Sequence, residues 1–324
     1  MSRIPLLMTA AVLAAPLAAQ SISENVAPNN GLTSGAPTVF LDLDIQNPLG
    51  INLTHLDTFC GVPAVPFTVD IWLKQDHYLT FERVPAAWTK VATASGISTT
   101  TTTISTAVLP TPLYLPPGQY GVGLQHSAGA RYQGTGSSTI LTTVSNSDLS
   151  MTLGASLSST LAAPFTGLSL FAPRKFSGTL YYTTYLGNSG AGFGFFGPGC
   201  PGSMGASHLT GNLPQLGSPF SVTIDRLPLS AAILLTGFSR TTSQFGPLPL
   251  DLSIFGAPNC PGRVSPDVTQ FVVGANNIAN TGFFIPNDPS LGGVQLYQQA
   301  FVLDPGFNSL GAVMSDAVAL LLGL

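Results

Sequence analysis

A short sequence motif occurs twice in the C-terminal half of the chain. Residues 196–202 read Phe-Gly-Pro-Gly-Cys-Pro-Gly, and residues 255–262 read Phe-Gly-Ala-Pro-Asn-Cys-Pro-Gly. Each copy places a cysteine in a turn made rigid by proline and glycine, just after an aromatic residue. Two such turns are suited to being joined, and we predict a disulfide between Cys200 and Cys260. Because structural disulfides belong to oxidising compartments, this pair favours a secreted protein rich in turns and strands.

The predicted disulfide leaves Cys60 without a partner, since the sequence has three cysteines. A thiol of this kind is either buried and inert or paired with another chain. Apolar residues on both sides of it, in Phe59–Val62, favour the buried state. The long spacings between the cysteines match no usual zinc-ligand pattern.

Composition favours strands and turns over helices. Charged residues make up only 7% of the 324 residues, and the chain has 35 Gly and 27 Pro. Soluble domains average about 25% charged residues. The formal net charge of −4 and the absence of any Lys/Arg cluster exclude a nucleic-acid partner, because phosphate neutralisation needs several basic groups on one face.

The N-terminus has the features of a signal peptide over residues 1–19. Arg3 supplies a positive charge, residues 4–17 are apolar, and Leu17-Ala18-Ala19 forms a cleavage site before Gln20. We therefore predict a secreted, extracellular or cell-surface protein. No later stretch has the 18 or more consecutive apolar residues of a membrane span, so no membrane-spanning segment is expected after cleavage.

Two β-sandwich domains are predicted after the signal peptide, which makes the fold class all-β. A glycine-rich stretch over residues 187–194 is the predicted linker. It separates a jelly-roll-like domain over residues 24–186 from a sandwich of immunoglobulin-like size over residues 195–324 that contains the disulfide.

Alternation of apolar and polar residues places the strands. Residues 38–45 and 67–74 each put four apolar side chains on one face. Further strands are expected at 89–94, 119–125, 139–144, 149–153, 167–171 and 178–185, and in the second domain at 220–224, 232–237, 248–254, 268–274, 281–285, 293–302 and 317–322. Tyr120 follows the turn Pro116-Pro117-Gly118, and this arrangement resembles the tyrosine corner of extracellular sandwich domains.

The second domain resembles a module of secreted proteins from planctomycete-type bacteria. The resemblance rests on Gly-Pro-Gly-Cys-Pro-Gly at 197–202, Leu-Pro-Leu-Asp-Leu at 248–252, Ser-Pro-Asp at 265–267, Ile-Pro-Asn-Asp-Pro at 285–289, Tyr-Gln-Gln-Ala at 297–300 and Leu-Asp-Pro at 303–305. It covers residues 196–324 and implies an exported accessory module of unknown function. It assigns no catalytic residue.

Candidate ligand-binding residues come from two Trp-x-Lys triplets. Trp72 with Lys74 and Trp88 with Lys90 contain the only tryptophans in the sequence. Because residues two apart share a strand face, Trp72 lies with Asp70 and Lys74 on the polar side. An aromatic ring among polar groups can stack on sugar C–H groups, which predicts polysaccharide or another envelope component as partner. The alternative is that a loop covers the ring and that it serves packing.

Catalytic and metal-binding motifs are absent from the sequence. It contains neither His-Glu-x-x-His nor Gly-x-Ser-x-Gly, so no enzyme activity and no catalytic residue are predicted. No cofactor or metal site is assigned, although Asp42 with Asp44 leaves structural calcium open. The predicted function is a non-catalytic structural or surface-associated protein of the envelope or extracellular matrix. The alternatives are a carbohydrate- or surface-binding module and a hydrolase with an unrecognised site.

Overall fold

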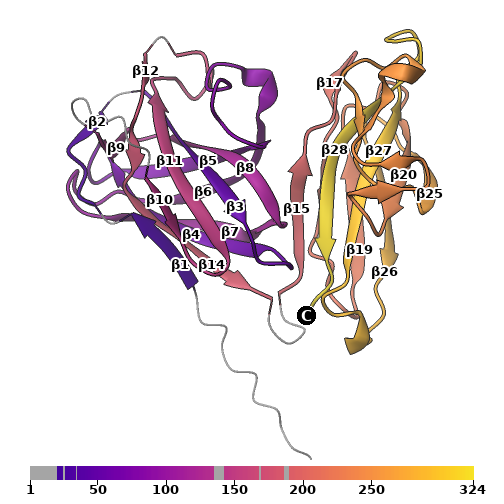
Figure 1. Ribbon diagram of the computed structural model, residues 1–324, viewed down its shortest axis with the longest axis horizontal. Coiled ribbons are helices and arrows are strands. Elements are labelled where there is room, and N and C mark those ends of the chain that lie inside the picture. Colours follow the sequence, from indigo (N-terminus) through magenta and orange to yellow (C-terminus); the bar gives the residue numbers. More distant parts are fainter. Residues whose placement is uncertain (1–19, 25, 34, 135–141, 168, 186–189) are drawn as a thin grey trace, which may run out of the picture.

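The computed structural model describes residues 20–324 except for 25, 34, 135–141, 168 and 186–189. Strands form two separate bodies that lie side by side, one from each half of the chain, with β15 between them (Figure 1). The all-β class is confirmed, and the antiparallel sheets are consistent with the predicted β-sandwich domains. The predicted signal peptide, residues 1–19, lies outside the described residues. No helix in the described part of the chain is long and apolar enough to cross a membrane.

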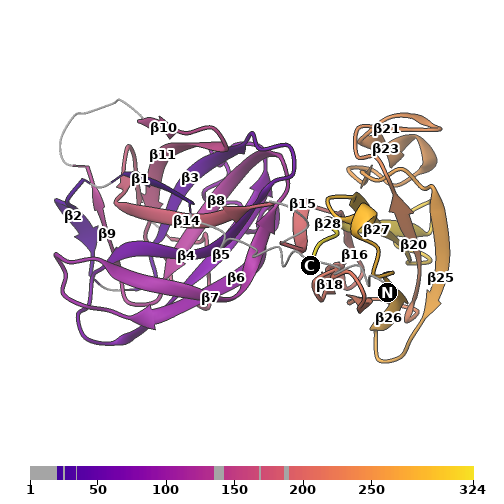
Figure 2. The same ribbon diagram turned by 90° about the horizontal axis from the view of Figure 1, so that it is seen from below.

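The first domain is one continuous sheet that curls toward closure. Its strands are β1 (Gln20–Glu24), β2 (Asn30–Leu32), β3 (Thr38–Ile45), β4 (Ile51–Cys60), β5 (Pro66–Gln75), β6 (Thr89–Ile97), β7 (Ser105–Leu115), β8 (Gly118–His126), β9 (Ala130–Gln133), β10 (Thr143–Ser145), β11 (Leu149–Leu157), β12 (Leu170–Phe171), β13 (Lys175–Phe176) and β14 (Gly178–Thr184). The main path runs β1-β14-β4-β7-β6-β5-β8-β3-β11-β10. Its two ends meet where Asn146 donates to the carbonyl of Ser21 at 3.3 Å, so the domain approaches a barrel (Figure 2).

The second domain packs two antiparallel sheets over a common core. Its strands are β15 (Gly192–Gly197), β16 (Pro201–Gly202), β17 (Gly205–Ala206), β18 (Leu209–Gly211), β19 (Pro219–Ile224), β20 (Ala231–Gly237), β21 (Thr242–Ser243), β22 (Gly246–Pro247), β23 (Leu250–Asp251), β24 (Pro261–Gly262), β25 (Val268–Val273), β26 (Ala279–Phe284), β27 (Gln295–Leu303) and β28 (Ala312–Leu321). A five-stranded sheet, β15-β28-β27-β20-β25, faces the three-stranded sheet β18-β19-β26. Short 3-10 helices complete the structure: η1 (Pro85–Ala87), η2 (Leu252–Phe255) and η3 (Pro289–Leu291).

Period-2 alternation located several of the long strands, but β4 and β7 were not predicted. Of the strands expected over 139–144 and 167–171, residues 139–141 and 168 lie outside the described part of the chain, and β10 and β12 cover only 143–145 and 170–171. The prediction for residues 38–45 coincides with β3, and Val39, Leu41, Leu43 and Ile45 all lie in the first domain's core. The tyrosine corner is also confirmed, because the buried Tyr120 hydroxyl donates to the carbonyl of Pro116 at 2.9 Å.

The strand predicted over residues 248–254 is wrong for most of its length. Only Leu250 and Asp251 form strand β23, and η2 follows at once. Asp251 caps that helix, since its carboxylate accepts from the backbone N–H of Ser253 at 2.9 Å. A capping aspartate therefore overrides the apolar alternation at this point.

The glycine-rich stretch over residues 187–194 is in part a strand. Gly192 and Gly194 belong to β15, whereas residues 187–189 lie outside the described part of the chain. A Cβ on Gly192 would lie 2.5 Å from the ring of Tyr114 in β7, and a Cβ on Gly194 would collide with the Tyr114 carbonyl oxygen. These glycines therefore permit close approach between the domains. Their number alone had instead predicted a flexible linker.

The cysteines behave as the sequence predicted. Cys200 and Cys260 form a disulfide, and both sulfur atoms lie in the second domain's core. Cys60 is a free thiol that is fully buried in the first domain. Burial raises its pKa, so it is less reactive than an exposed thiol.

Candidate functional site

The two predicted tryptophans lie in a cluster that a loop of the same domain covers. Trp88 is 6% exposed, and its ring stacks on Phe165 with centroids 5.0 Å apart. Trp72 meets the edge of the same phenyl ring at 5.2 Å and donates from Nε1 to Gln125 Oε1 at 3.3 Å. Both indoles therefore contact the Phe165 ring, which packs over this part of the sheet. This placement favours the packing alternative over an open sugar-stacking platform.

The two predicted lysines separate in space. Lys74 is buried, and its ammonium group donates to the carbonyls of Gln75 and His77. Desolvation lowers its pKa. Lys90 is half exposed and pairs with Asp70 at 2.8 Å. The four predicted ligand residues thus do not form one site, and Lys90 lines a cavity with room for a ligand to which the other three do not contribute.

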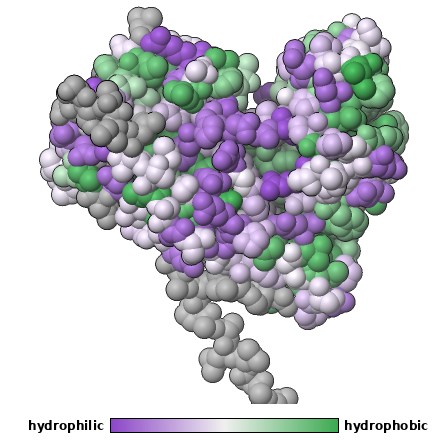
Figure 3. Space-filling model, in the orientation of Figure 1, coloured by the Kyte–Doolittle hydropathy of each residue, from purple (hydrophilic) through white to green (hydrophobic). Residues whose placement is uncertain are grey.

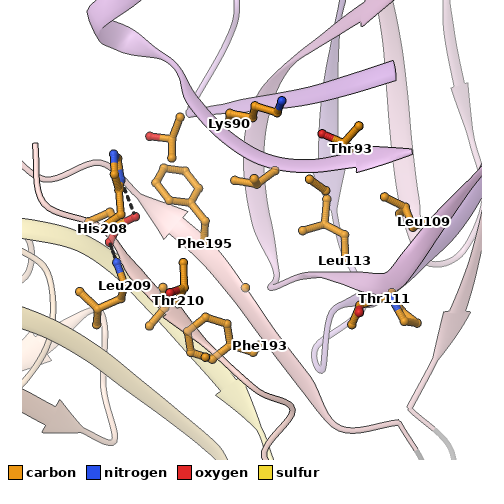
Figure 4. Close-up of a pocket in the computed structure, with 18 of the residues that line it drawn as sticks. Lys90, Thr93, Leu109, Thr111, Leu113, Phe193, Phe195, His208, Leu209 and Thr210 are labelled. Carbon is orange, nitrogen blue, oxygen red and sulfur yellow. Dashed lines mark hydrogen bonds and ion pairs between the residues drawn. The ribbon is translucent and has the colours of Figure 1, made fainter. Parts of the chain in front are cut away.

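A cavity of about 300 Å³ lies between the domains beside β15. Figure 4 shows its walls: Phe193 and Phe195 of β15, Lys90 and Thr93 of β6, Leu109 to Leu113 of β7, and His208 to Thr210 at the start of β18. Most of the lining is aliphatic or aromatic. Threonine hydroxyls, the Lys90 ammonium group and the His208 imidazole supply the polar groups, so the cavity combines an apolar floor with a polar rim.

Two prolines in β7 leave the space for this cavity. The register between β4 and β7 passes from Leu53 opposite Leu113 to His55 opposite Val108, so residues 109–112 have no partner in β4. Pro110 and Pro112 lie in this bulge and have no backbone N–H to donate. The bulged segment forms one side of the cavity.

A histidine and an aspartate at the cavity form a hydrogen-bonded pair (Figure 4). His208 donates from Nδ1 to Asp316 Oδ2 at 3.1 Å, and the backbone N–H of Leu209 donates to the other oxygen at 2.7 Å. The hydrogen bond to Asp316 raises the pKa of His208, while burial raises the pKa of Asp316. Arg226 donates to Nε2 of His208 at 3.1 Å.

These contacts define what the pair can do chemically. With Nδ1 protonated toward Asp316, Nε2 is an acceptor, and the Arg226 guanidinium already occupies it. A general base would need that lone pair directed at a substrate or a nucleophile. The arrangement instead supports a tether, in which a buried carboxylate on β28 holds the beginning of β18.

The outer edge of the second domain exposes large apolar side chains. Figure 3 shows hydrophobic residues along this edge, and Figures 1 and 2 place β25 there, away from the first domain. We call the following group the edge face, because its members line or flank β25 and each is 42% to 67% exposed: Phe238, Val268, Phe271, Val273 and Phe283. Because side chains alternate along a strand, Phe271 and Val273 lie on one face of β25, and Val268 lies on the other face, beside a cavity that Phe238 and Phe283 also line. Exposed apolar groups on both faces of one strand are typical of an interaction surface.

β25 is also an unprotected edge strand. In the part of the chain that the structure describes, it pairs with β20 and with no strand on its other side, and the register is continuous over Val268 to Val273. Its sequence, Val-Thr-Gln-Phe-Val-Val, contains no charge and no proline. Natural proteins use charges, prolines and bulges to keep sheet edges from pairing with other chains. The outer N–H and C=O groups of β25 are therefore available for strand addition.

The structure identifies positions that the sequence analysis did not single out. His208 and Asp316 are 108 residues apart, and no local spacing links them. Phe271 had a usable signal, since residues 268–273 are apolar or β-branched at every position except Gln270. Such a strand is either doubly buried or exposed to a partner, and the pattern does not distinguish the two. Among the described residues, no three His, Cys, Asp or Glu side chains gather as a metal site.

Comparisons with known proteins add no family to this description. No protein-family model matches the chain, and a search of curated proteins finds no match. The similarity of residues 196–324 to secreted planctomycete-type modules stays a prediction.

Proposed function

We propose that this chain is a secreted, non-catalytic structural protein that assembles with copies of itself through β25. The observation that carries the proposal is the combination of an unpaired edge strand with the apolar edge face around it. Backbone groups on a free edge bind another strand, and the apolar side chains next to them gain from burial.

A second copy of the chain is the partner that this edge fits best. An antiparallel pair of identical strands around a two-fold axis satisfies both edges at once, and most homodimers have such symmetry. The edge face is uncharged, so two copies approach without like-charge repulsion. Assembly at a cell envelope or in a matrix is consistent with the low charge of the whole chain.

The test measures association of the purified protein by sedimentation velocity over a range of concentrations. We expect reversible dimers or larger species in the wild type. Phe271→Lys places a charge on the outer side of β25 and should weaken association at least about tenfold, because it adds a buried charge to the interface. Phe245→Lys is the matched control, since Phe245 is 65% exposed but lies in the β21–β22 turn.

Two results would contradict the proposal. One is a wild-type protein that stays monomeric at every concentration and is recovered as freely soluble material from producing cells. The other is an equal loss of association in Phe271→Lys and Phe245→Lys, which would place the contact away from β25.

Glycan binding in the cavity beside β15 is the second candidate function. The observation in its favour is the apolar floor with Phe193 under a rim of threonine hydroxyls and Lys90. Retention of the protein on insoluble polysaccharides should then fall in Lys90→Ala and persist in Phe271→Lys. Retention that is unchanged in Lys90→Ala would argue against this cavity.

A further inference from the structure

A second cavity lies between the two domains, near the C-terminal end of β15. Its volume is about 220 Å³. The first domain contributes Gln75, Asp76 and the turn Pro117–Tyr120, and the second domain contributes Arg240 and Arg263. Neither the proposed assembly edge nor the cavity beside His208 shares these residues. The following inference is therefore independent of self-association.

Arg263 is fixed in place, but most of its hydrogen-bonding capacity is unused. Its Nε donates to the carbonyl of Pro198 at 2.8 Å, and its Nη1 donates to Gln75 Oε1. Its backbone N–H is held by Gln299 Oε1 at 2.7 Å. A guanidinium has five N–H groups. The side chain is therefore pre-positioned across the domain boundary, and three of these five groups have no acceptor among the described residues.

Arg240 approaches the same cavity from a different loop. Its Nη2 donates to the carbonyl of Pro117 at 2.6 Å. The guanidinium carbon lies 5.8 Å from the ring centroid of Phe196 and 5.9 Å from that of Tyr297. These aromatic contacts hold the plane of the guanidinium, and a side-chain hydrogen bond to Tyr120 fixes it further. A guanidinium has five N–H groups, so others remain for a further acceptor.

The charge of the two arginines is not balanced within the protein. Among the described residues, neither guanidinium has a carboxylate within 4.0 Å. Asp76 acts on Arg263 only from a longer distance, and burial lowers the pKa of Arg263 to about 10. Two arginines and one aspartate leave a net charge of +1 on the cavity lining. A partly buried, unpaired cation is costly, and an anionic ligand removes that cost.

We propose that this cavity binds a singly charged oxyanion group, a carboxylate or a sulfate ester. A guanidinium presents parallel N–H groups that match two oxygens of such a group. The lining charge of +1 fits a monoanion better than a dianion. A cavity of 220 Å³ is smaller than the roughly 300–1,000 Å³ of sites for drug-sized ligands, so the occupant is a single acidic sugar residue or a smaller anion.

The test titrates the purified protein with glucuronate, methyl sulfate and acetate by calorimetry, with glucose as the neutral control. We expect the anions to bind and glucose not to bind. Arg240→Gln should weaken binding about tenfold or more, because it removes a charge-assisted hydrogen bond. Asp76→Asn should tighten binding severalfold, because it removes a negative charge from the lining.

Asp76→Asn also keeps the test decisive if Arg240→Gln fails to fold. Asp76 is exposed and has a φ of 62°, a conformation that asparagine adopts readily. Tighter binding of glucuronate than of acetate would support an acidic sugar as the occupant, and equal binding would support the bare anion. The proposal is overturned if no anion binds the wild type, or if binding is the same in both variants as in the wild type.

Discussion

The two domains differ in whether the aromatic side chains on their sheets are covered by other parts of the chain. In the first domain, Phe165 packs against both Trp72 and Trp88, so that Trp88 is buried and Trp72 is partly buried. In the second domain, Phe271 and its neighbours on the edge face have no cover from the described residues. The indole N–H groups of the covered cluster are satisfied within the domain, whereas phenylalanine has no polar atom to satisfy. The first group therefore behaves as a small additional core, and the second is suited to contact with another molecule.

The largest expected effect comes from the disulfide, which only the second domain has. Cys200→Ser together with Cys260→Ser opens a link across 60 residues and should destabilise that domain by about 4 kcal/mol. The first domain, with its buried free Cys60, should keep its stability. Denaturant unfolding followed by circular dichroism should show one transition moving and the other staying. If both transitions shift equally, the domains do not unfold independently.

The next effect tests the covered aromatic cluster. Phe165→Ala should lower the free energy of unfolding by about 3 kcal/mol, because Phe165 is fully buried. Both tryptophans contact this ring, so their fluorescence should shift to longer wavelength as water reaches them. Phe271→Ala is the matched control and should change stability by less than about 0.5 kcal/mol. A similar loss of stability in both variants would remove the distinction between covered and open rings.

A smaller effect is expected at the boundary between the two domains. Gly192→Ala places a Cβ 2.5 Å from the Tyr114 ring and should cost about 2 kcal/mol through overpacking. Tyr114→Ala is itself destabilising because Tyr114 is fully buried, but Gly192→Ala should cost less in that background, since the ring it collides with is gone. Thermal unfolding of the single and double variants measures this coupling. Strict additivity would show that the two residues do not press on each other.

The smallest expected effect is a pH dependence at the His208–Asp316 tether. The folded-state pKa of His208 is raised, chiefly by its hydrogen bond to Asp316, so its stabilising contribution is full below the unfolded pKa. That contribution is lost as pH rises through the folded pKa. His208→Asn should therefore cost about 1 kcal/mol near pH 5.5 and less near pH 8.5. A cost that grows with pH would contradict this sign.

The regular strands and the disulfide could be predicted from sequence because their signals are local. Alternation over residues 38–45 predicts β3, and the repeated cysteine-containing motif predicts the Cys200–Cys260 pair. β7 escaped prediction, since Pro110 and Pro112 interrupt its pattern where it bulges away from β4. The ligand residues failed to gather for a different reason. A Trp-x-Lys triplet fixes which strand face a ring occupies, but a distant residue, Phe165, decides whether that ring is covered.

The close contact of Tyr114 with Gly192 also limits the shape of any assembly. β15 and β25 are the two opposite margins of the same five-stranded sheet, and Tyr114 anchors the first domain at the β15 margin. Two copies joined at β25 would share a sheet of ten strands, five from each copy, with a first domain at either tip. Such a particle is an elongated dumbbell that tumbles slowly for its mass. The two copies of the first domain would be held at a fixed distance from each other.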